Sequence, residues 1–135
     1  MSSTFASSPN IPIKVLLADD AQVMRRAIRL LLESHSQVEL VGEATDFAQT
    51  IQMAKDLKPH VIVMDLYMPR DRNLDVKSHL NGGSQLLAMS ISNDDEAKLL
   101  AESFGAAVLL DKTDLYATLV PAIIRSVTPE QGHHR

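Results

Sequence analysis

Five short apolar runs along the chain predict buried β-strands. They are Ile13–Ala18, Val38–Val41, Val61–Met64, Leu86–Met89 and Ala106–Leu110. Each run is bounded by charged or turn-forming residues, and the runs are too short for helices buried on all sides. Nearly continuous apolar strands of this kind are typical of parallel sheets that are covered on both faces.

The segments between the apolar runs show helical periodicity. In residues 21–35 the apolar side chains recur at Val23, Ala27, Ile28, Leu31 and Leu32, while Arg25, Arg26 and Arg29 fall largely on the opposite, solvated face. Three further helices are expected, from a Thr45 or Asp46 cap to about Leu57, from a Ser92 or Asn93 cap to Phe104, and from a Thr113 or Asp114 cap to about Val127.

Two segments depart from this regular pattern. Residues 70–85 have weak periodicity and predict a short or distorted helix. Pro121 falls within the last predicted helix, and it should either kink this helix or delay its start. Gly42 is expected to close the second strand, and Gly105 suits the residue after a helix end.

The alternation amounts to five βα units, which predicts an α/β fold. Five units favour an open, doubly wound parallel sheet with helices on both faces, and are too few for an eight-unit barrel. We expect a disordered Ser-rich tail at 1–10, one domain at 11–128, and a linker or C-terminal tail at 129–135.

Composition narrows the possible functions. The 135 residues include no cysteine, which excludes a thiol nucleophile, a Cys-ligated zinc and a dithiol redox motif. The formal net charge of −4 disfavours a nucleic-acid-binding role for this segment. No apolar stretch approaches the ~20 residues of a membrane span, and the polar N-terminus does not resemble a signal peptide. We therefore expect a cytoplasmic protein without a membrane partner.

Polar residues follow four of the predicted strands. They are Asp19 and Asp20, Asp65, Ser90, and Lys112 two positions after its strand. Parallel strands end at the same edge of a sheet, where ligands bind, so these side chains should converge. Two carboxylates ~4 Å apart repel by about 4 kcal/mol at an effective dielectric constant near 20. Such a cluster therefore requires either a raised pKa or a bound cation, and Mg²⁺ suits carboxylate oxygen ligands.

Carboxylates, a divalent ion, a lysine and a hydroxyl together indicate phosphoryl transfer, with a carboxylate as the nucleophile. Each residue alone has an ordinary explanation. Asp20 could cap a helix, Asp65 could form a turn, Ser90 could start a helix, and Lys112 could be a solvated charge. Their joint occurrence at four strand ends favours the functional interpretation.

The sequence resembles receiver domains of two-component response regulators. The matching features are Asp19-Asp20 after the first strand, Asp65 followed by Met68-Pro69, Ser90, and Gly105-Ala106 with Lys112. The resemblance covers about residues 11–127. Within that family, the segments Glu39–Ala44 and Ser90–Glu96 look most like receivers of LuxR-type transcription regulators.

The resemblance implies a flavodoxin-like (βα)5 fold with strand order 2-1-3-4-5, and a role for each site residue. Asp65 would accept the phosphoryl group and contact Mg²⁺. Asp20 would bind the ion directly, Asp19 through water, and Tyr67 through its backbone carbonyl. Lys112 would pair with the phosphoryl oxygens, and Ser90 would be the hydroxyl that moves during switching.

The same resemblance implies partners and an output. The phosphoryl donor would be a sensor histidine kinase or a phosphotransfer protein, and a homodimer is possible. DNA would be contacted only through a domain outside this chain. The chain would not be an enzyme, apart from slow self-dephosphorylation.

Leu109 departs from the family pattern, which usually has Tyr or Phe three residues before the lysine. Its apolar side chain has no hydroxyl to expose or bury, so the usual aromatic switch is in doubt. Thr113 replaces a common proline, and no cis peptide is expected there.

Three alternatives remain open. A receiver-like domain could work by dimerisation or partner binding without phosphorylation. A phosphatase of the haloacid-dehalogenase type would need a second acid two residues after the nucleophile, where Tyr67 stands. A nucleotide-binding flavodoxin-like protein would need a Gly-rich phosphate loop, and the five glycines form none.

Overall fold

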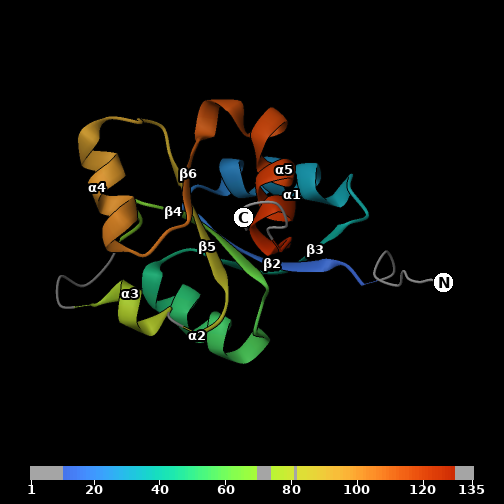
Figure 1. Ribbon diagram of the computed structural model, residues 1–135, viewed down its shortest axis with the longest axis horizontal. Coiled ribbons are helices and arrows are strands. Elements are labelled where there is room, and N and C mark those ends of the chain that lie inside the picture. The colour runs from blue at the N-terminus through green and yellow to red at the C-terminus, as the bar shows by residue number, and fades with distance from the viewer. Residues whose placement is uncertain (1–10, 70–73, 81, 130–135) are drawn as a thin grey trace, which may run out of the picture.

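A five-stranded parallel sheet runs through the centre of the molecule, with helices on both sides (Figure 1). The computed structural model describes residues 11–69, 74–80 and 82–129, so the expected tail at 1–10 and residues 130–135 lie outside the described ranges. The strands are β2 (Ile13–Ala18), β3 (Val38–Ala44), β4 (Val61–Asp65), β5 (Gln85–Ser90) and β6 (Val108–Asp111). The helices are α1 (Gln22–Glu33), α2 (Phe47–Leu57), α3 (Val76–His79), α4 (Asp95–Ser103) and α5 (Leu115–Val127).

The strand order is β3-β2-β4-β5-β6, and every pairing is parallel. In chain order this is 2-1-3-4-5, so the predicted fold class and order are confirmed. The order reverses direction between β2 and β4. Ligand sites in open α/β sheets lie beside such a reversal, at the carboxyl ends of the strands.

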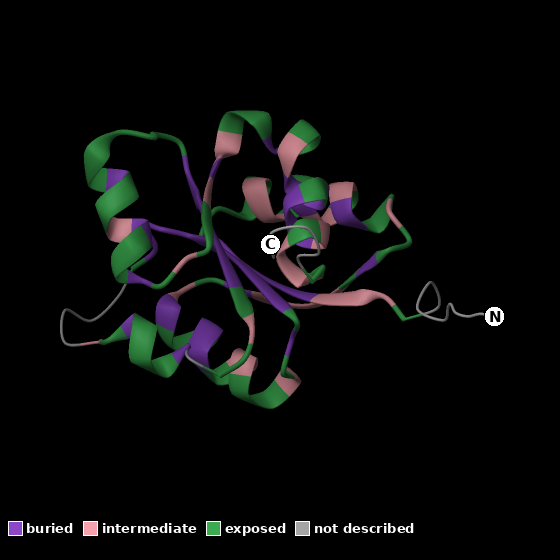
Figure 2. Ribbon diagram, viewed as in Figure 1, coloured by how far each residue is buried: buried purple, intermediate pink, exposed green. Residues whose placement is uncertain are grey.

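Alternate residues of the central strands pack into two separate cores. Val15 and Leu17 of β2 face α1 and α5, whereas Leu16 and Ala18 face α2 and α4. Full burial of one such aliphatic side chain contributes about 1.5–3 kcal/mol. Figure 2 shows the result, with purple strands at the centre and green on the outer sides of the helices. This two-sided burial explains why the strands are continuously apolar.

Several predicted boundaries need correction. Gly42 does not end β3, which continues to Ala44. A Cβ atom at Gly42 would lie 2.6 Å from Met53 Cε and 2.8 Å from Leu57 Cδ1, so this glycine serves the close packing of α2. The last strand begins at Val108, because the Ala106 N–H still donates to the Ala101 carbonyl at the end of α4.

Other expectations are confirmed or refined. Gly105 has a positive φ of 80° directly after the Phe104 cap, as expected for that position. The third helix is indeed short, with four residues. Pro121 lies inside α5, but the helix begins at Leu115, so its start is not delayed.

The predicted apolar face of α1 is partly wrong. Val23 is 84% exposed and Ala27 is also exposed, whereas Ile28 and Leu32 are buried as predicted. Arg25 and Arg29 do not belong to a fully solvated face, because both form ion pairs with Glu43 on the edge strand β3. Among the described residues, no helix has the length and apolar character needed to cross a bilayer.

The cap of α4 also differs from the expectation. The N-cap is Asp94, whose carboxylate accepts a hydrogen bond from the Ala97 N–H at 2.9 Å, whereas Ser92 and Asn93 lie before it in the loop. Hydrogen bonds from Ala97 and Ser92 lower the pKa of Asp94 below its ordinary value. Serine, asparagine and aspartate all suit this position, so the sequence alone could not choose between them.

We predict that Asp94→Ala lowers the melting temperature by about 3–5 °C, because α4 loses the acceptor for one of its free N–H groups. Asp95→Ala, in the first turn but without a cap hydrogen bond, is the matched control. Since folding lowers the Asp94 pKa, the difference between the two variants should persist at neutral pH. It should disappear as the pH falls through that lowered pKa. Equal melting temperatures at pH 7 would contradict the cap assignment.

Candidate functional site

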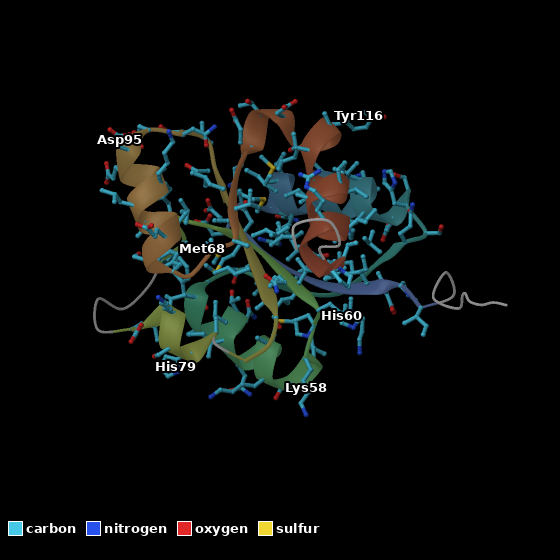
Figure 3. All side chains as sticks on the ribbon, viewed as in Figure 1. Lys58, His60, Met68, His79, Asp95 and Tyr116 are labelled. Carbon is cyan, nitrogen blue, oxygen red and sulfur yellow. The ribbon has the colours of Figure 1, made fainter. Side chains whose placement is uncertain are left out.

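The carboxyl ends of the strands open into one hollow. Its lining comprises Asp19, Asp20, Ala21, Asp65, Tyr67, Ser90, Ile91, Ser92 and Lys112. The hollow lies at the end of the molecule where α4 and α5 begin. In Figure 3 the labels Asp95 and Tyr116 mark those helix starts, and Lys58 and His79 mark the opposite end. All the predicted site residues except Leu109 therefore meet in one place.

Lys112 is the cation at the centre of the hollow. Its Nζ lies 2.6 Å from Asp19 Oδ2 and 3.3 Å from Asp65 Oδ1, and its side chain is only 8% exposed. A short 3₁₀ turn, Lys112–Asp114, carries it directly after β6. Asp111 caps this turn through its carboxylate, which accepts from the Thr113 N–H at 2.9 Å. One buried ammonium group thus neutralises part of two carboxylate charges.

Asp19 is held by its neighbours and is fully buried. Its N–H donates to the Ala44 carbonyl at 3.0 Å, as an extension of the β2–β3 pairing. Its Oδ1 accepts from the Ala21 N–H at 2.8 Å. Its Oδ2 makes no hydrogen bond within the described part of the chain, and its polar contact there is the Lys112 ion pair.

Asp65 ends β4 and is 6% exposed. Burial is the largest influence and raises the pKa of its carboxyl group, and the Asp19 charge raises it further. The Lys112 ammonium and the Tyr67 N–H act in the opposite direction, but burial prevails. Leu66 and Met68 in the loop after Asp65 are buried, which holds this loop against the core.

Asp20 is the exposed member of the acidic group. It could have been a simple helix cap, but the α1 N-cap is Ala21, without a side-chain cap bond. Carboxylate oxygens of Asp19, Asp20 and Asp65 lie within 4.8 Å of one another. These three acids form a donor set of carboxylate oxygens that suits a hard divalent cation.

Ser90 ends β5 and is fully buried. Its Oγ accepts from the Ser92 N–H at 3.1 Å, so the hydroxyl is engaged with the following loop. Asn93 in that loop donates to Asp111 at 3.4 Å, which connects it to the residue before Lys112. Sequence reasoning missed Asp111, because an aspartate at a strand end is also a common turn residue.

Tyr67 and Ile91 form the rim of the hollow and are 51% and 74% exposed. Partial desolvation, followed by the charges of Glu96, Asp94 and Asp65, raises the pKa of the Tyr67 phenol. Leu109 lies apart from the hollow. It is partly buried and packs against the core beneath α2, α3 and α4.

Comparisons with known proteins agree with this geometry. Residues 15–123 match the response regulator receiver domain family. Transcriptional regulatory protein YdfI of Bacillus subtilis is 31% identical over 108 residues, 78% of this chain and 51% of that protein. Protein-glutamate methylesterase/protein-glutamine glutaminase 2 of Saccharophagus degradans is 32% identical over 112 residues, 80% of this chain and 32% of that protein.

A solved structure of a LuxR-family two-component response regulator from Aurantimonas sp. SI85-9A1 superposes with a TM-score of 0.75. It is 26% identical, and the match covers 84% of each chain. The resemblance to receiver domains read from the sequence is therefore confirmed. The chain spans about half the length of YdfI and a third of the methylesterase, so the activities of those whole proteins are not transferred with the match.

We predict that Lys112→Met lowers the free energy of unfolding by about 3 kcal/mol at pH 7 without added metal, because it leaves the buried Asp19 carboxylate without its counter-ion. The exposed Lys98→Met is the control. The loss should shrink as the pH falls, because Asp65, whose pKa is already raised, then protonates and removes one of the two charges. Urea unfolding across pH measures this, and a loss no greater than that of the control would contradict it.

Proposed function

The chain belongs to the response regulator receiver domain family, and from this premise we propose that it is a phosphoryl-accepting switch with Asp65 as the acceptor. The observation that carries the proposal is the position of Lys112, whose Nζ lies 3.3 Å from Asp65 and 2.6 Å from Asp19. A buried ammonium beside a carboxylate that lines the hollow can bind the oxygens of an incoming phosphoryl group. An ordinary structural ion pair would not require Asp20 as a third acid beside the two that Lys112 contacts.

In the proposed reaction a carboxylate oxygen of Asp65 attacks the phosphorus of a phosphohistidine. A new O–P bond forms, and the N–P bond to the imidazole breaks. The imidazole leaves with the bond's electron pair and takes up a proton, so that the product is an aspartyl phosphate. The protein's part is to position Asp65 and to neutralise charge, because the transferred group carries its charge on three oxygens.

We propose Mg²⁺ as the metal. Asp20 and Asp65 would hold it directly, Asp19 through water, and the Tyr67 backbone carbonyl would add a ligand. The bound ion would supply positive charge next to the transferring phosphoryl oxygens. The mutual proximity of the three carboxylates supports this role. Since protons compete with the metal, the raised pKa of Asp65 implies that the affinity for Mg²⁺ decreases as the pH falls.

Switching would follow from a change of partners in the hollow. Lys112 would move from the Asp19 carboxylate toward the phosphoryl oxygens. The Ser90 hydroxyl would exchange the Ser92 N–H for the phosphoryl group, and this would shift the loop before α4. Phosphorylation would then favour one of two existing conformations of that loop. With Leu109 in place of an aromatic residue, the loop rather than a rotating ring would carry the change.

The phosphoryl donor would be a sensor histidine kinase or a phosphotransfer protein in the cytoplasm. YdfI is named a transcriptional regulatory protein, and the chain covers 51% of its length. We therefore propose a receiver domain over residues 11–128 that acts on an effector outside this chain, with transcription regulation through a DNA-binding domain as the output. This proposed role is compatible with a homodimer.

One alternative has a specific observation in its favour. Leu109 lacks the aromatic ring and hydroxyl of the usual switch, which fits a receiver that signals by dimerisation or partner binding without phosphorylation. The intact acidic group with Lys112 favours the phosphorylated form instead. A dehalogenase-type phosphatase is disfavoured, because Tyr67 stands where a second catalytic acid is needed.

We predict that Asp65→Asn abolishes labelling by a small acyl-phosphate donor with Mg²⁺, since the amide cannot attack phosphorus. Asp56→Asn, an exposed acid on α2, is the control and should be labelled like the wild type. Intact-mass spectrometry measures the label. Undiminished labelling of Asp65→Asn would refute the assignment of Asp65 as the acceptor. Absence of labelling in the wild type would favour the alternative in which the domain signals without phosphorylation.

We predict that Tyr67→Ala speeds hydrolysis of the aspartyl phosphate several-fold, because the phenol at the rim shields the acyl phosphate from water. Tyr116→Ala is the matched control, since Tyr116 is 87% exposed on α5 and does not line the hollow. Loss of label over time after removal of the donor gives the rate. An unchanged rate in Tyr67→Ala would exclude this shielding role.

A further inference from the structure

We propose that Arg25 is a positioning residue for the metal-binding acids, and that it acts by fixing the peptide group between Asp19 and Asp20. The inference rests on the proposed function, because it assumes a divalent cation at Asp20. It adds a residue from α1 that does not line the hollow.

The contact is a hydrogen bond to the backbone. The Arg25 guanidinium donates from Nη1 to the Asp19 carbonyl oxygen at 2.8 Å, and the side chain is only 18% exposed. A hydrogen bond from a charged donor is roughly twice as strong as a neutral one. The bond is also partly shielded from water, which preserves its electrostatic strength.

Glu43 on β3 holds the guanidinium in this orientation. Its Oε1 lies 3.4 Å from Arg25 Nε, and its Oε2 accepts from Arg29 Nη1 at 2.7 Å. The planar guanidinium is thus contacted at Nε and at Nη1 by different groups, which limits its rotation. The edge strand β3 thereby supports the turn that follows β2.

The Asp19 carbonyl belongs to the peptide group that joins Asp19 to Asp20, so its orientation affects both acids. The Asp19 side chain is already fixed, by the Ala21 N–H and by Lys112. Asp20 is different, because its side chain has no hydrogen bond or ion pair within the described ranges. Its placement depends on the backbone, which is restrained on one side by the Arg25 hydrogen bond to the Asp19 carbonyl and on the other by the Ala21 N–H bond to Asp19 Oδ1.

The start of α1 makes this restraint more important. The Ala21 N-cap has no side-chain cap bond, and the first turn contains no acidic residue. The Arg25 hydrogen bond therefore connects the first turns of the helix to the preceding loop in place of a cap. If this were only a stabilising contact, its loss would affect stability alone. A positioning role requires that metal affinity changes as well.

The test compares three arginines of α1 in the full chain. Arg25→Gln removes the bond to the Asp19 carbonyl, Arg29→Gln removes a Glu43 contact without touching Asp19, and Arg26→Gln changes an exposed side chain. Calorimetric titration with Mg²⁺ gives the dissociation constant, and thermal unfolding without metal gives stability. Removing a supporting partner of a metal ligand typically weakens affinity 10–100-fold.

We expect Arg25→Gln to weaken Mg²⁺ binding about tenfold, with Arg29→Gln and Arg26→Gln within twofold of the wild type. Arg25→Lys, which can still donate to the carbonyl, should restore part of the affinity. A loss of stability in Arg25→Gln with wild-type affinity would overturn the inference, as would an equal loss of affinity in Arg29→Gln. A wild type that binds no Mg²⁺ would instead refute the metal part of the proposed function.

Discussion

The burial of carboxylate charge at the strand ends is the constraint on which the rest of the site depends. Asp19 is fully buried and Asp65 nearly so, and one lysine lies between them. Two neighbouring acids in a poorly hydrated site are costly unless a cation or a proton is present. The fold therefore holds an unbalanced cluster of negative charge, which makes the binding of further positive charge favourable.

The parallel sheet is what makes such a cluster possible. Apolar packing on both faces buries β4 throughout, β2 over its last four residues and β5 over its last five, and the hollow opens beyond the carboxyl ends of these strands. Polar residues distant in sequence then meet without any local motif. Around them, Asp111 fixes the turn that carries Lys112, and Arg25 fixes the turn between the two adjacent acids.

Much of this could be predicted from the sequence, because the central strands are nearly continuous apolar runs and Asp65 directly follows one of them. The weaker signals failed for identifiable reasons. Gly42 resembled a strand end, but its missing side chain serves packing against α2. The Arg25 contact joins a side chain on α1 to a backbone oxygen and to Glu43 on β3, and neither periodicity nor charge pattern encodes such a pairing.

We propose that the acidic cluster makes one particular carboxylate, that of Asp65, the phosphoryl acceptor. Borohydride reduction after treatment with an acyl-phosphate donor and Mg²⁺ converts an aspartyl phosphate to homoserine, and peptide mass spectrometry then locates it. We expect homoserine at Asp65 and at no other acid. Homoserine at Asp19 or Asp20, or a phosphoryl group recovered on a histidine, would contradict it.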